Sequence, residues 1–65
     1  MNMICESSKA VFIWGIAQLS EAADKPHTVE LNPLFDTLIY RVGGQVVGME
    51  TGGRYFLEQE EIATA

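Results

Sequence analysis

The sequence predicts an α+β protein in which one N-terminal helix packs on a small antiparallel sheet. A long apolar run occupies residues 10–19, ahead of Pro26. Two Gly-Gly pairs, at 43–44 and 52–53, divide the stretch 37–58 into three short runs rich in β-branched and aromatic residues, which favour strands. The 65 residues predict a single domain, which buries only about 60% of the surface of its unfolded chain.

The helix is predicted over residues 9–24. Ser7 or Ser8 offers an N-cap, because its side-chain oxygen can accept a hydrogen bond from a free backbone N–H. Pro26 ends the helix, since it disfavours helical geometry in the residue before it. On helical spacing one face carries Phe12, Ile13, Ile16, Leu19 and Ala23.

A second interpretation of the same region is a buried strand. Residues 10–19 are apolar on both alternating faces, so periodicity alone does not separate a strand from a helix here. Ser20 would then cap a short helix. In either case we expect Trp14 to pack in the core, because it lies within the most apolar run. Residues 1–5 form either a frayed end or a short edge strand.

The middle of the chain allows two architectures. Residues 27–31 predict a short edge strand, and Asn32-Pro33 marks a turn. Residues 37–42 then begin a three-stranded meander, with 27–31 as a fourth strand. Alternatively, Asn32 caps a second helix over 33–42, which gives two helices followed by a β-hairpin.

The glycine pairs fix an expected register. As two-residue hairpin turns, they place Tyr40 opposite Val47, Leu38 opposite Met49, and Met49 opposite Phe56. One face would then carry Leu38, Tyr40, Val42, Val47, Met49 and Phe56. The other would carry Thr37, Ile39, Arg41, Val46, Gly48, Glu50, Tyr55 and Leu57.

The second of these faces is the predicted interface. A lone helix covers one side of a sheet, and a solvated second side should be mostly polar. An apolar patch between charged residues is typical of a protein interface, and a strand glycine often marks close approach by another group. The predicted interface residues are Ile39, Arg41, Val46, Gly48, Tyr55 and Leu57. The alternative is that the N-terminal segment and residues 27–31 cover this face as core.

Charge and cysteine content narrow the function. Nine acidic residues oppose four basic ones, for a net charge of −5, which disfavours nucleic acid and anionic membranes. A protein partner with a basic surface is favoured instead. Cys5 is the only cysteine, and Glu6 beside a lone Lys9 fits a secretory signal poorly, so we expect a cytoplasmic protein.

The sequence contains no motif that is typical of catalysis or of ligand binding. His27 is the only histidine and is expected to be a solvated loop residue, and Cys5 lies next to a carboxylate that disfavours the thiolate. The glycine pairs do not match a phosphate-binding loop. We therefore predict no enzyme activity, no cofactor and no metal. Residues 59–65 are expected to form a frayed or disordered tail.

These observations predict a small acidic interaction module that binds a larger protein as a homodimer. It would act as an inhibitor, an adaptor or an accessory subunit. Small inhibitors encoded by viruses or mobile elements share this profile. The alternatives are a nucleic-acid-related regulator with the helix-helix-hairpin layout, and an acidic mimic of DNA.

Overall fold

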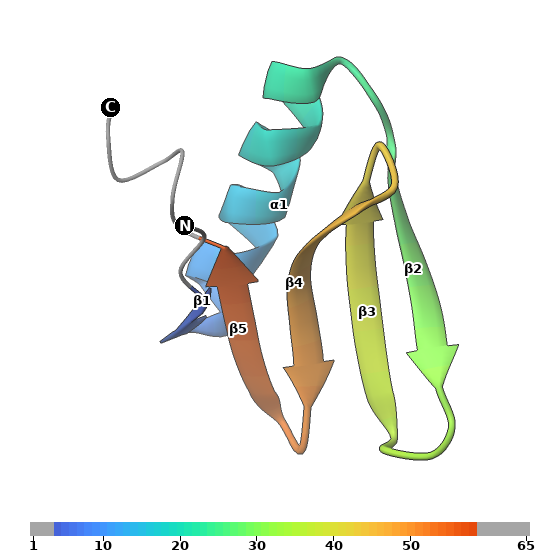
Figure 1. Ribbon diagram of the computed structural model, residues 1–65. Coiled ribbons are helices and arrows are strands. Elements are labelled where there is room, and N and C mark those ends of the chain that lie inside the picture. Colours follow the sequence, from blue (N-terminus) through green and yellow to red (C-terminus); the bar gives the residue numbers. More distant parts are fainter. Residues whose placement is uncertain (1–3, 59–65) are drawn as a thin grey trace.

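One helix packs against a single antiparallel sheet of five strands (Figure 1). The computed structural model describes residues 4–58, so the tail expected at 59–65 lies outside the described residues. The elements in chain order are β1 (Ile4–Ser7), α1 (Lys9–Ala23), β2 (His27–Asn32), β3 (Thr37–Val42), β4 (Gln45–Thr51) and β5 (Arg54–Glu58). The spatial order of the strands is β1-β5-β4-β3-β2, and every neighbouring pair is antiparallel.

The α+β class and the single N-terminal helix are confirmed, whereas the sheet is larger than predicted. The predicted edge strand at 27–31 exists as β2, and β1 adds a strand at the opposite edge by pairing with β5. The second helix considered for residues 33–42 is wrong. Asn32 caps a turn there, because its side-chain oxygen accepts a hydrogen bond from the Leu34 N–H at 3.2 Å.

The ends of α1 follow the sequence signals. Ser8 is the N-cap, and its hydroxyl oxygen accepts a hydrogen bond from the Val11 N–H at 3.2 Å. At the other end Asp24 takes the left-handed conformation, with φ of 54°, and its N–H donates to the Glu21 carbonyl. The strand interpretation of residues 10–19 is therefore wrong.

Both glycine pairs form the predicted hairpin turns, with φ between 57° and 84° at all four glycines. The register that follows is only partly as predicted. Met49 lies opposite Phe56, as expected, but Tyr40 lies opposite Gly48, because an irregularity between Tyr40 and Arg41 leaves Val47 without a partner in the ladder. One extra residue in one strand shifts every later pair by one, and so exchanges the faces.

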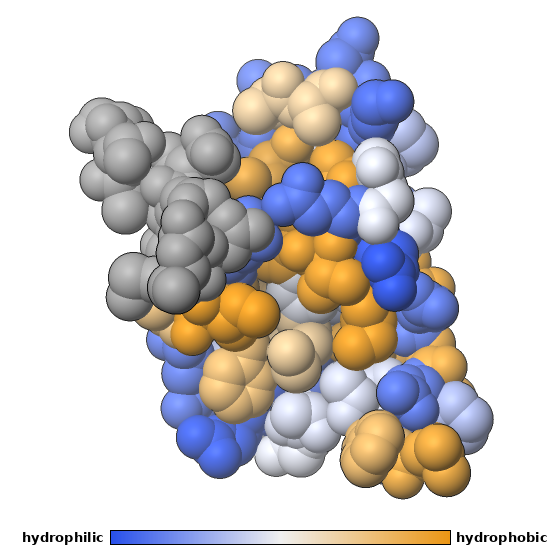
Figure 2. Space-filling view, in the orientation of Figure 1, coloured by the Kyte–Doolittle hydropathy of each residue, from blue (hydrophilic) through white to orange (hydrophobic). Residues whose placement is uncertain are grey.

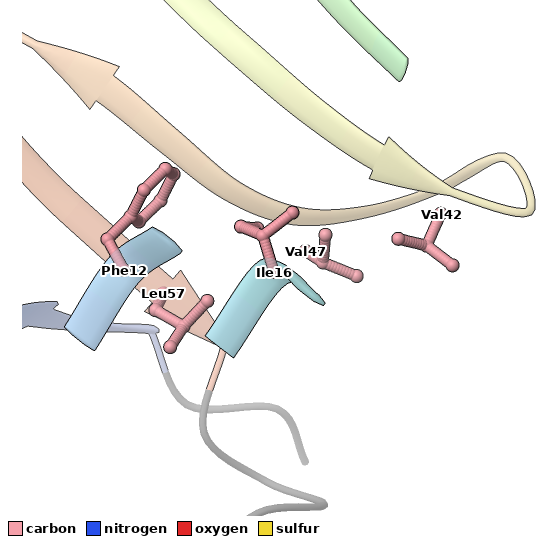
Figure 3. Packing of buried hydrophobic residues seen from close by; sticks show 5 residues of the cluster. All are labelled: Phe12, Ile16, Val42, Val47 and Leu57. Atoms are coloured by element: carbon pink, nitrogen blue, oxygen red, sulfur yellow. The ribbon is translucent and has the colours of Figure 1, made fainter. Parts of the chain in front are cut away.

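The core lies between α1 and the sheet. Its buried apolar residues are Phe12, Ile16, Val42, Val47 and Leu57, drawn in Figure 3. Trp14 is not among them: its side chain is 52% exposed, because it points away from the sheet on the outer side of α1. The prediction that Trp14 packs in the core was wrong.

Candidate functional site

The six predicted interface residues do not share one face of the sheet. Ile39, Arg41 and Val46 lie on the open face, which no element among residues 4–58 covers. Gly48, Tyr55 and Leu57 lie on the inner face, under α1. A Cβ on Gly48 would meet the Phe12 ring at 2.8 Å, and Leu57 is completely buried. The cause of this error is the Val47 irregularity.

The open face carries a cross-strand row that runs over all five strands. Direct pairing aligns Glu6 with Phe56, Phe56 with Met49, Met49 with Ile39, and Ile39 with Glu30. We call these five residues the outer row. Its three central members are apolar and half-buried, and its two ends are carboxylates. Figure 2 shows apolar side chains gathered over the middle of the sheet.

Each end of the outer row holds an arginine. Arg54 donates two hydrogen bonds to the Glu6 carboxylate, at 2.8 and 3.0 Å, and these bonds lower the pKa of the Glu6 carboxyl. Arg41 forms an ion pair with Glu30. Both pairs are solvent-exposed, so each contributes little to stability. The positive and negative charges within each pair balance.

The inner face is only partly covered by α1, and a groove opens beside the helix. Its volume is about 520 Å³. One wall is the helix side that carries Phe12, Ile13, Ile16 and Ala17, and the floor is formed by Tyr40, Glu50 and Tyr55. His27 and Lys9 also line it, the latter from the first turn of the helix. We call this feature the inner groove.

Strand pairing sets the positions of the groove floor. Tyr55 lies directly opposite Glu50, while Tyr40 lies diagonally across from it, beside Gly48. The Phe12 ring meets both tyrosine rings, with centroids 4.9 Å from Tyr40 and 5.3 Å from Tyr55. The Glu50 carboxylate is therefore placed among aromatic rings.

The hydroxyl of Tyr40 is held in its neutral form. Burial raises its pKa, and the charge of Glu50 and hydrogen bonding to it raise the pKa further. A neutral phenol is a hydrogen-bond donor, and a carboxylate such as that of Glu50 is an acceptor. Among the described residues, Glu50 forms no ion pair with a lysine or arginine.

Sequence reasoning missed the inner groove. His27 was expected to be solvated, and it is exposed, but it is the first residue of β2 and not part of a loop, and its ring stacks on Tyr40 with centroids 6.3 Å apart. Glu50 and Tyr40 were assigned to opposite faces. The signal that could have revealed their proximity is Gly48, which directly follows the unpaired Val47, because a glycine inside a strand often marks a bulge.

Within residues 4–58 no group of three or more acidic, histidine or cysteine side chains could hold a metal ion. In the same part of the chain, no helix is long and apolar enough to cross a membrane. The fold and the two surfaces define a small α+β protein with one open sheet face and one aromatic groove. Comparisons with models of known families, with curated proteins and with solved structures gave no match for this chain.

Proposed function

We propose that this chain is a protein-interaction module that pairs with a second copy through the open face of its sheet and binds a larger protein with the opposite side. The observation that carries this proposal is the outer row, in which Ile39, Met49 and Phe56 form an apolar stripe on a face that no described element covers. Solvated sheet faces are ordinarily polar, and a central apolar patch with a charged rim is typical of an interface.

Charge favours a second copy as the occupant of this face. The chain has a net charge of −5, so two copies repel one another overall. Yet both arginines of the chain lie on the open face, and each is paired with a glutamate, so these four charges balance. The net charge of −5 arises elsewhere in the chain, where the remaining seven carboxylates outnumber the two lysines. Two copies can therefore meet here with little repulsion, while each presents an acidic surface elsewhere.

Such a dimer would present two inner grooves to a partner. Linking two binding sites raises the apparent affinity for a partner with two matching segments. The module would act by occupying a surface, as an inhibitor, an adaptor or an accessory subunit, in the cytoplasm. The acidic remainder of the molecule favours a partner with a basic surface.

Sedimentation equilibrium tests this proposal. We expect the wild type to be dimeric and Met49→Glu to be a folded monomer, because a buried unpaired charge at the centre of an interface is costly. Gln18→Glu adds the same charge on the exposed side of α1 and should remain dimeric. Circular dichroism confirms folding of each variant. A wild type that stays monomeric at high concentration, or a Met49→Glu dimer, contradicts self-association through this face.

The second candidate, a nucleic-acid-related role, has a weaker basis. A helix-helix-hairpin layout is not the fold, since α1 is the one helix in the described region. Both arginines are already paired with glutamates, which leaves Lys9 and Lys25 for phosphate contacts. Undetectable DNA binding at low salt would discard this role.

A further inference from the structure

We propose that the inner groove receives a lysine or arginine side chain of the partner protein, with its cationic group at Glu50 and its stem between the aromatic rings. This inference rests on the proposed function only in that the occupant belongs to a protein. It goes beyond the proposed function by naming the kind of side chain that the groove binds.

The inner groove combines a carboxylate with aromatic rings. Glu50 supplies the carboxylate, and Phe12, Tyr40 and Tyr55 line the same groove with their rings in contact. Aromatic rings attract cations through their negative faces, and a carboxylate behind them completes a site for an ammonium or guanidinium group. The charge of Glu50 would repel an anionic ligand at this position.

Glu50 has no lysine or arginine partner among residues 4–58. In the part of the chain that the structure describes, both arginines are committed to Glu6 and Glu30 on the open face. Lys9 lines the groove without forming an ion pair with Glu50. The partly buried Glu50 carboxylate, which shares the groove with Tyr40, is therefore available to a cation from outside.

Exposed apolar side chains flank the groove. Val29 and Leu31 lie on the same inner face, where they pair with Tyr40 and Leu38, and α1 does not reach far enough to bury them. They are 47% and 58% exposed. Apolar side chains beside a cation site fit a segment in which a basic residue stands between apolar neighbours. A free small cation would leave this apolar surface uncovered, which favours a peptide segment.

A titration of the full chain with two short peptides tests the inference. The probes are acetyl-Leu-Arg-Leu-amide and the same peptide with citrulline, which keeps the shape of arginine but has no charge. Backbone amide shifts in two-dimensional NMR spectra report where each peptide binds. We expect the arginine peptide to shift the amides of Tyr40, Glu50 and Val29, and to bind about tenfold more tightly than the citrulline peptide.

Two variants separate the groove from general attraction to an acidic protein. Glu50→Gln should weaken binding of the arginine peptide about tenfold, while Glu30→Gln removes the same charge on the open face and should change it less than about twofold. Equal affinity of the two peptides, equal losses in the two variants, or shifts confined to the open face would each overturn the inference. The comparison of the two peptides, together with the amide shifts that locate each of them, needs no variant. It therefore tests the inference even if Glu50→Gln does not fold.

The outcome is independent of self-association. Met49 lies on the opposite face of the sheet from the groove, so a monomeric Met49→Glu variant should bind the arginine peptide as the wild type does. A monomeric wild type that binds the peptide would contradict the proposed dimer and leave the groove assignment in place. A wild type that is dimeric but binds the arginine and citrulline peptides equally well would contradict the groove assignment and leave the proposed dimer in place.

Discussion

Gly15 lies directly against Leu57, where α1 crosses β5. A Cβ on Gly15 would fall 2.3 Å from the Leu57 Cδ2 atom, closer than packed atoms approach. A mid-helix glycine costs about 1 kcal/mol relative to alanine, so the sequence alone makes Gly15 a weak point. The structure explains its presence, because the missing side chain lets the helix approach the sheet and lets Leu57 become fully buried.

Gly15→Ala should destabilise the protein by about 1 kcal/mol, measured by urea unfolding. The gain in helix propensity is about 1 kcal/mol, but overpacking a tight core costs about 1–3 kcal/mol. Leu57→Ala itself should cost about 2–5 kcal/mol, because it leaves a cavity in the core. In that background Gly15→Ala should stabilise the protein, because the new methyl group enters the vacated space. Ala17→Gly, on the exposed part of the helix, reports the propensity contribution alone. Additive effects of Gly15→Ala and Leu57→Ala would contradict this contact.

Gly48→Ala should cost more, about 3 kcal/mol, because part of its clash is with backbone. A Cβ on Gly48 would lie 2.8 Å from the Phe12 ring and 2.9 Å from the carbonyl oxygen of Phe56. A side chain can change rotamer, whereas the Phe56 carbonyl belongs to the ladder between β4 and β5. Phe12→Leu in the same background should therefore fail to restore stability in urea unfolding. A full rescue would show that the ring alone excludes the methyl group.

Ser8→Ala should destabilise the protein by about 1 kcal/mol, because the Val11 N–H loses the oxygen that caps the helix. Ser7 is the matched control. Its hydroxyl donates to the Ser8 carbonyl, so it does not satisfy a free N–H of the helix, and Ser7→Ala should stay within about 0.5 kcal/mol of the wild type. Thermal unfolding followed by circular dichroism measures both. Equal effects would mean that the cap is not fixed at Ser8.

The parts of the fold that could be predicted are those with local signals. Ser8, Pro26 and the glycine pairs act within a few residues, so helix ends and hairpin turns follow from them directly. The strand β1 has no such signal. It is short and half of its residues are polar, and it becomes a strand because the edge of β5 is available for pairing, which is a property of the assembled sheet.

The faces of the sheet were predicted wrongly, because they depend on one extra residue, Val47, and the glycine beside it was read as a contact site and not as the mark of a bulge. Val47 is accommodated without a partner, and it packs in the core instead. Without the bulge, Gly48 and Leu57 would belong to the open face. The sequence did indicate that Gly48 marks a close approach, and this is confirmed, but the approaching group is Phe12 of the same chain rather than a partner. The change of register at Val47 also places Tyr40 and Glu50 on the same face, in the inner groove.

Glu50→Gln should lower the pKa of Tyr40 toward its ordinary value of 10.0, without restoring it fully. Burial is the largest cause of the raised pKa and remains in the variant, while the charge of Glu50 and hydrogen bonding to its carboxylate are removed or weakened. The ultraviolet absorbance of phenolate follows the titration, in a Tyr55→Phe background that leaves Tyr40 as the one tyrosine. Glu30→Gln, on the opposite face, should leave the pKa of Tyr40 unchanged.

The raised pKa of Tyr40 also predicts how the stability of the protein depends on pH. The folded-state pKa of Tyr40 lies above the unfolded value, so its contribution is fully present below that unfolded value and is lost as the pH rises through the folded pKa. Unfolding free energy should therefore fall in alkaline solution, above pH 10.0, and fall less steeply in Glu50→Gln. If Glu50→Gln left both the titration and this slope unchanged, the carboxylate would not lie at the Tyr40 ring. A cation in the groove would then have no anion to meet, so the alkaline titration tests the geometry of the proposed site before any ligand is added.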